Sequence, residues 1–107
     1  MTLVTDCYST TKTFPRDEQF GLTAQLRRAA VSIPSNVAEG ACRHSDRVYL
    51  NHVGIALGSH AELETCLELA RRLEYLTAAV FAPLSEACTR TGQLLNGLYR
   101  SIEQRVR

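Results

Sequence analysis

Apolar residues between positions 22 and 40 recur at intervals that place them on one face of an α-helix. They are separated by four, four, three and four positions, at Leu22, Leu26, Ala30, Ile33 and Val37. This spacing fits the 3.6-residue period of a helix and not the alternation of a strand. Pro34 lies inside this stripe and costs a helix interior roughly 3 kcal/mol. The sequence therefore predicts a helix that is kinked near Pro34.

Three other segments carry a similar period. A weak helical stripe covers 3–13 and stops before Phe14-Pro15, because the residue before a proline is disfavoured in the α region. Ser45 and Thr77 have the side-chain oxygens expected of N-caps. We therefore expect four helices, at 3–13, 22–41, 46–74 and 78–106.

The third of these helices has an unusually wide apolar surface. Its central stripe consists of Val53, Ala56, Leu63, Leu67 and Ala70. Further apolar residues widen the stripe, at Leu50, Leu57, Ala61, Leu69, Leu73 and Leu76. One neighbouring helix cannot cover so broad a surface, which fits the centre of a bundle or contact with a partner subunit. With short links between helices, the prediction is an all-α, up-down-up-down antiparallel four-helix bundle forming one domain, 1–107.

Composition supports this architecture and limits the function. Hydrophobic residues make up 45% of the 107 residues and aromatic residues only 7%, with no Trp, so Leu and Ala must fill the core. The net charge of +1 is not that of a strongly basic nucleic-acid binder. No apolar run approaches the roughly 20 residues of a membrane span, and no secretory leader is recognisable. We therefore expect a cytoplasmic protein with no membrane partner.

The cysteines do not have the spacing of a metal site. They lie 35, 24 and 22 residues apart, at Cys7, Cys42, Cys66 and Cys88, and no CxxC pair occurs. This arrangement gives no support to a zinc ribbon or a thioredoxin-like site. We interpret the four thiols as small buried hydrophobic groups.

Four arginines are candidates for a nucleic-acid contact, namely Arg27, Arg28, Arg43 and Arg47. Neutralising several phosphates would make such binding dependent on salt concentration. The alternative is that Arg27 and Arg28 pair with carboxylates inside the bundle or across subunits, since guanidinium groups match carboxylates well. The sequence favours this second, structural interpretation.

Polar residues embedded in the apolar stripes are a second set of candidates, at Asn36, Glu39, Ser59, Glu62 and Glu64. We expect a hydrogen-bonded network between the second and third helices that fixes their register. Under this hypothesis a Glu39→Ala substitution damages folding or assembly. An acid–base pair of Glu39 and Glu62 is the less favoured alternative.

A metal site has only partial support. His52, His60 and Glu64 lie on one ridge of the third helix, at spacings of eight and four residues. A third or fourth ligand is not evident, and the Glu-x-x-His motif of di-iron bundles does not occur in the sequence. We expect no catalytic residue, cofactor or metal.

Three segments of the chain resemble the 23S ribosomal RNA intervening-sequence protein family. They are QLRRAAVSIPSNVAEG (25–40), YLNHVGIALGSHAELETCLELARRLEYL (49–76) and LLNGLYRSI (94–102). The resemblance implies a bacterial four-helix bundle, and related bundles assemble as homopentamers. A relative, the accessory variability determinant of diversity-generating retroelements, binds nucleic acid and a reverse transcriptase. The first helix here looks about ten residues shorter than is usual in the family.

These observations lead to two functional hypotheses. The first is a non-enzymatic homo-oligomer, a pentamer by resemblance, that acts as an assembly or adaptor module. The second is an RNA- or DNA-binding accessory factor that presents its arginines repeatedly around the oligomer, so that weak patches bind together.

Overall fold

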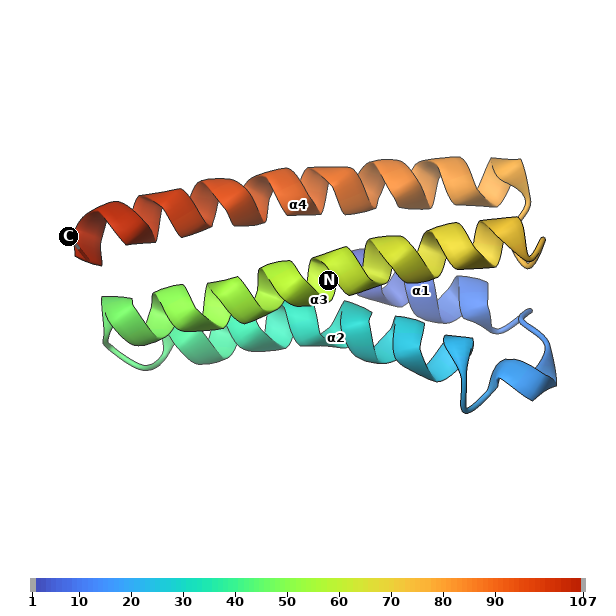
Figure 1. The fold of residues 1–107 in the computed structure, drawn as a ribbon, viewed down its shortest axis with the longest axis horizontal. Coiled ribbons are helices and arrows are strands. Elements are labelled where there is room, and N and C mark those ends of the chain that lie inside the picture. Colours follow the sequence, from blue (N-terminus) through green and yellow to red (C-terminus); the bar gives the residue numbers. More distant parts are fainter. Residues whose placement is uncertain (1, 107) are drawn as a thin grey trace.

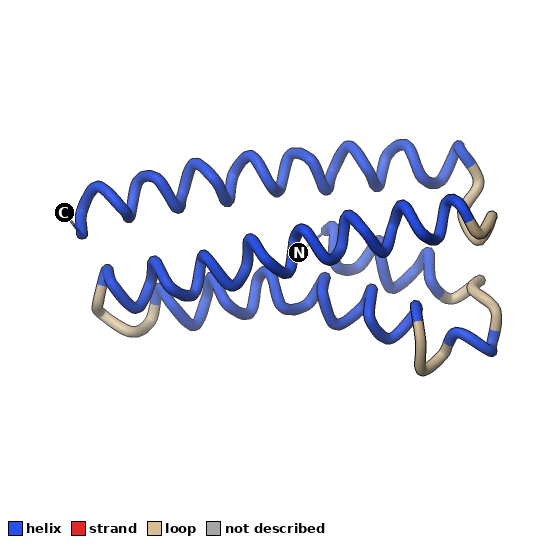
Figure 2. The backbone as a smooth tube through the Cα atoms, viewed as in Figure 1, coloured by secondary structure: helices blue, strands red, loops and turns tan. Residues whose placement is uncertain are grey.

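The computed structural model describes residues 2–106, and nearly all of them are helical. Four α-helices and one short 3₁₀-helix follow one another: α1 (Thr2–Thr11), η1 (Arg16–Glu18), α2 (Leu22–Ala41), α3 (Asp46–Arg72) and α4 (Ala78–Val106). Figure 2 shows no strand among the described residues. The predicted all-α class is confirmed, and α2 and α4 have the bounds expected from the sequence. The first helix ends at Thr11 instead of residue 13, because the next two amides bond to carbonyls three residues back, as in a turn.

The helices lie side by side and antiparallel along a molecule of 46 × 24 × 19 Å (Figure 1). The long helix α3 packs against both α2 and α4, whereas the backbones of α2 and α4 do not approach each other closely. The short helix α1 packs against α2 and α4 over one half of the molecule only. One half is thus a four-helix bundle, and the other half contains only α2, α3 and α4.

Local sequence explains where α3 and α4 begin. Ser45 has an extended backbone, and its Oγ accepts a hydrogen bond from the Val48 amide at 3.3 Å. Thr77 caps α4 in the same way, since its Oγ1 accepts from the Val80 amide at 3.3 Å. These are the N-caps that the sequence predicts. Asp46 in the first turn of α3 adds a favourable charge at the positive end of the helix dipole.

The end of α3 differs from the prediction, because the helix stops at Arg72 instead of residue 74. Glu74 has a φ of 63°, in the left-handed region that ends a helix. The Tyr75 amide then donates to the Ala70 carbonyl at 2.9 Å, and the Glu74 amide donates to the Arg71 carbonyl at 3.0 Å. This pair of bonds is a Schellman motif. It turns the chain sharply toward α4.

The core consists mainly of leucine, isoleucine, valine and alanine side chains from all four helices. Its most deeply buried large residues are Leu26, Leu63, Ile102 and Val53. Cys7, Cys66 and Cys88 are buried among them, but Cys42 is exposed. The expectation of four buried thiols is therefore wrong for Cys42, which follows the last residue of α2.

Gly40 allows α2 and α3 to approach closely beside the turn that joins them. A Cβ at this position would lie 2.7 Å from the Cβ of His52 and 3.0 Å from the Tyr49 ring. Real atoms do not come so close, so one helix would have to move. Gly58 on α3 is different, because no described atom lies within 4 Å of a Cβ built there.

We predict opposite effects for alanine at these two glycines. Gly40→Ala should lower the free energy of unfolding by about 1–3 kcal/mol, because it overpacks the α2–α3 contact. Gly58→Ala should raise the free energy of unfolding by roughly 0.5–1 kcal/mol, because alanine is the better helix former. Urea unfolding monitored by circular dichroism measures both. Equal effects at the two sites would contradict the close approach at Gly40.

Candidate functional site

Four half-buried polar side chains join α2 to α3, and we call them the α2–α3 polar seam: Ser32, Asn36, His52 and Ser59. The Ser32 and Ser59 hydroxyls are hydrogen-bonded at 2.7 Å. The Asn36 amide donates to the Ser32 carbonyl at 2.9 Å and to its hydroxyl at 3.0 Å. Nδ1 of His52 lies 3.1 Å from Oδ1 of Asn36 and donates to it. The seam links one side of α2 to α3 over about two turns.

Two of the five residues expected in a polar network, Asn36 and Ser59, lie in this seam. The structure places Glu39 elsewhere, in an exposed ion pair with Arg43 at 3.1 Å. Glu62 is exposed, and Glu64 faces His60 with 3.6 Å between the carboxylate and Nδ1. A carboxylate in the α2–α3 interface would lose its hydration, which explains why the uncharged residues form the seam and the glutamates face water.

His60 is a buried polar residue of the α3–α4 interface, and the residue is 8% exposed. Its Nε2 donates to the Cys88 carbonyl at 2.7 Å. A Cβ at Gly92 would lie 2.5 Å from the imidazole ring, so only glycine leaves room for the ring there. Sequence reasoning identified His60 and Glu64 but not Cys88, which lies 28 residues away from His60 on another helix.

The buried thiols are not activated nucleophiles. Burial raises the pKa of Cys88 to about 12, and the nearby Glu64 carboxylate adds to the rise. Burial likewise raises the pKa of Cys7 to about 11, with a contribution from Asp6. Both thiols therefore stay protonated at neutral pH, and neither has the electropositive surroundings of a catalytic cysteine.

The four candidate arginines do not act as one group. Nε of Arg27 donates to Oγ1 of Thr11 at 2.8 Å, and its guanidinium lies 4.8 Å from the centre of the Tyr8 ring. Arg27 thereby holds α1 against α2. Arg43 pairs with Glu39, whereas Arg28 and Arg47 are exposed.

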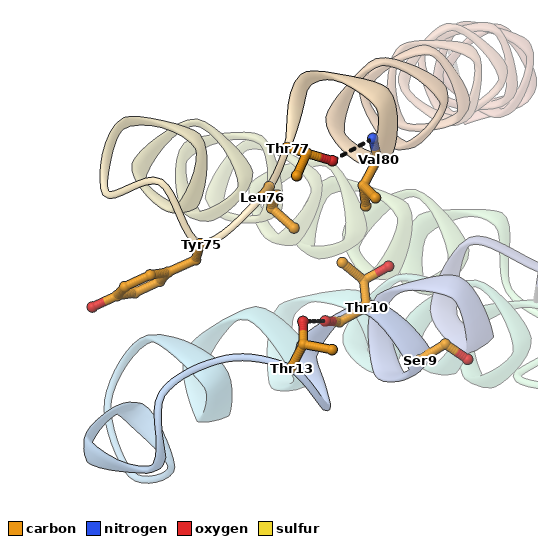
Figure 3. Close-up of a pocket in the computed structure, with 7 residues that line it drawn as sticks. All are labelled: Ser9, Thr10, Thr13, Tyr75, Leu76, Thr77 and Val80. Atoms are coloured by element: carbon orange, nitrogen blue, oxygen red, sulfur yellow. Dashed lines mark hydrogen bonds between the residues drawn. The ribbon is translucent and has the colours of Figure 1, made fainter.

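A small hollow lies between the end of α1 and the turn from α3 to α4 (Figure 3). Hydroxyl and apolar side chains line it, from Ser9, Thr10, Thr13, Tyr75, Leu76, Thr77 and Val80. The Thr13 hydroxyl donates to the Thr10 carbonyl at 3.0 Å, and the Tyr75 hydroxyl donates to Glu18 at 2.9 Å. That bond raises the pKa of Tyr75, so the one titratable group here stays protonated. The hollow offers no acid–base pair for catalysis.

Apolar side chains remain exposed along the outside of α3. We call Ile55 and Leu69 of α3, together with Leu73 directly after its last residue, the outer row of α3. Each of the three is about half exposed. Leu94 on α4 is 75% exposed and Val31 on α2 is 39% exposed. The apolar surface of α3 is therefore wider than its neighbours in this chain cover, as the sequence predicts. Within residues 2–106, none of the helices is long and apolar enough to cross a membrane.

Comparison with known proteins agrees with the resemblance found in the sequence. A family model described as 23S rRNA-intervening sequence protein matches residues 1–97. The fold is similar to the crystal structure of a protein with unknown function from the S23 ribosomal protein family of Bacteroides thetaiotaomicron VPI-5482. The TM-score is 0.78 at 26% identity, over 90% of this chain and 87% of the other. No curated protein matches the chain.

We predict that Asn36→Ala destabilises the protein much more than Glu39→Ala does. Asn36→Ala should lower the free energy of unfolding by about 1–3 kcal/mol, because it leaves Nδ1 of the half-buried His52 without its acceptor. Glu39→Ala removes only an exposed ion pair and should cost less than about 1 kcal/mol. Thermal and urea unfolding of both variants measure the difference. If Glu39→Ala lowered the free energy of unfolding more than Asn36→Ala does, Glu39 would belong to the polar network that we expected from the sequence.

Proposed function

The chain belongs to the 23S rRNA-intervening sequence protein family, and on this premise we propose that it acts as a non-enzymatic homo-oligomer. In this role it is an assembly or adaptor module whose working surface forms when copies of the chain pack together. The single observation that carries the proposal is the outer row of α3.

The outer row has the geometry of a helix contact. Leu73 lies 18 residues after Ile55, which is five helical turns, so both side chains point the same way about 27 Å apart. Leu69, one turn before Leu73, continues the same line. The exposed Glu62 lies between Ile55 and Leu69 on this face, so the row offers its apolar area at two places, at Ile55 and at the Leu69–Leu73 end. Exposed apolar area of this kind is a feature of interaction surfaces. The occupant that we propose is a second copy, because the net charge of +1 causes little repulsion between copies.

A ring joins two different patches, one from each neighbouring copy. Leu94 supports a second patch, since it lies on α4 and is 75% exposed. Packing the outer row of one copy on the Leu94 region of the next would bury both. The family resemblance implies five copies for such a ring.

Nucleic-acid binding is the weaker candidate. Arg27 is bonded to Thr11, and the exposed Arg43 is paired with Glu39, so two of the four expected arginines already have partners within this chain. An enzymatic role also has little support, because the polar seam is satisfied internally and the buried thiols are protonated. The proposal therefore rests on assembly.

We predict that the protein elutes as an oligomer and that a charged residue introduced into the outer row dissociates this oligomer. Light scattering on a sizing column should give a mass several times 11.9 kDa at micromolar concentration. Leu69→Glu and Leu73→Glu should shift the mass toward the monomer, because a buried unpaired charge is costly. Thr89→Glu, at an exposed position on α4, is the matched control and should leave the mass unchanged. A monomeric wild-type protein would refute the proposal.

A further inference from the structure

Between α3 and α4 the structure brings together three side chains of the types that bind transition metals. We propose that His60, Glu64 and Cys88 form a Zn²⁺ site that joins these two helices. The proposed site differs from the interaction surface described above and does not depend on it.

The distances fit a metal site that contracts slightly around the ion. One ligand atom from each residue lies within 4.8 Å of the other two. Nδ1 of His60 and Oε1 of Glu64 are 3.6 Å apart, close to the roughly 3.4 Å that separates two nitrogen or oxygen ligands around a tetrahedral Zn²⁺. The side chain of Glu64 is 52% exposed and is free to rotate toward the other two ligands.

The surroundings of His60 have the features of a supported metal ligand. Metal-bound histidines almost always donate their other ring N–H to a carbonyl or carboxylate. Nε2 of His60 already does so, to the Cys88 carbonyl at 2.7 Å. This bond leaves Nδ1 as the coordinating nitrogen and points it toward Glu64. Gly92 lets the ring lie flat against α4, so the imidazole is held in position before any ion arrives.

The set of donor atoms selects the metal. A thiolate, an imidazole and a carboxylate together suit Zn²⁺, whereas Mg²⁺ and Ca²⁺ prefer oxygen ligands alone. On binding, the Zn–S bond forms as the Cys88 S–H bond breaks, and the proton leaves to solvent. A water molecule completes the fourth position.

An ion can reach these residues from the surface. Glu64 and Cys88 line a hollow between α3 and α4 together with Leu67, Glu68, Phe81 and Ser85. Glu64 contributes a carboxylate to this hollow, whereas the carboxylate of Glu68 is paired with Arg71 and Arg72. The hollow therefore provides the entry path that a metal site needs.

Cobalt binding tests the proposal, because Co²⁺ replaces Zn²⁺ and a cobalt–thiolate bond absorbs in the near ultraviolet. The exposed thiol is first removed by Cys42→Ser, so that it does not compete. In this background we expect one Co²⁺ per chain, thiolate absorption and its displacement by Zn²⁺. Cys88→Ser should abolish the absorption. Glu64→Gln should weaken binding at least about tenfold.

Glu62→Gln is the matched control, since Glu62 is exposed on the same helix and outside the proposed ligand set. It should bind Co²⁺ as the background protein does. Glu64→Gln changes an exposed side chain and so keeps the test valid if Cys88→Ser does not fold. Absence of stoichiometric Co²⁺, absorption that persists without Cys88, or equal weakening by Glu62→Gln would each overturn the proposal.

Discussion

The position of α3 between α2 and α4 is the constraint on which the rest of the structure depends. Because the backbones of α2 and α4 do not approach each other closely, α3 packs against both helices, and it uses different chemistry on each side. Toward α2 it presents the polar seam and the close approach at Gly40. Toward α4 it presents His60, packed on Gly92. Each interface contains a glycine that permits close approach and a histidine that donates a hydrogen bond. Together they fix the distance between the two helices and their register.

Most of the fold could be predicted because helical periodicity and capping are local properties. Ser45 and Thr77 mark the starts of α3 and α4 in the sequence, and both cap their helices. The end of α3 could not be predicted in the same way. Its left-handed residue is Glu74, where the usual marker would be glycine, so tertiary packing and not residue type ends the helix.

The candidate sites were only partly predictable, because their partners lie on other helices. Polar residues within apolar stripes pointed to Asn36 and Ser59, which are hydrogen-bonded in the polar seam. The same reasoning included Glu39, which lies at the exposed end of α2 with Arg43. Helical periodicity predicts which face of a helix a residue occupies, but it does not predict how deeply that residue is buried. Cys88 could not be assigned to His60 at all, since no spacing along one helix relates them.

The short α1 has a consequence for how the molecule moves. In the half of the molecule that α1 does not cover, α4 packs on α3 alone. The last turns of α4 are anchored mainly by the buried Ile102 and by an exposed ion pair of Arg105 with Asp46. The opposite end of α4 is held from two sides. Amide protons near the C-terminal end of α4 should therefore exchange through local opening, while those near its start exchange only in larger unfolding events. The start of α4 is thus more resistant to local opening than its C-terminal end.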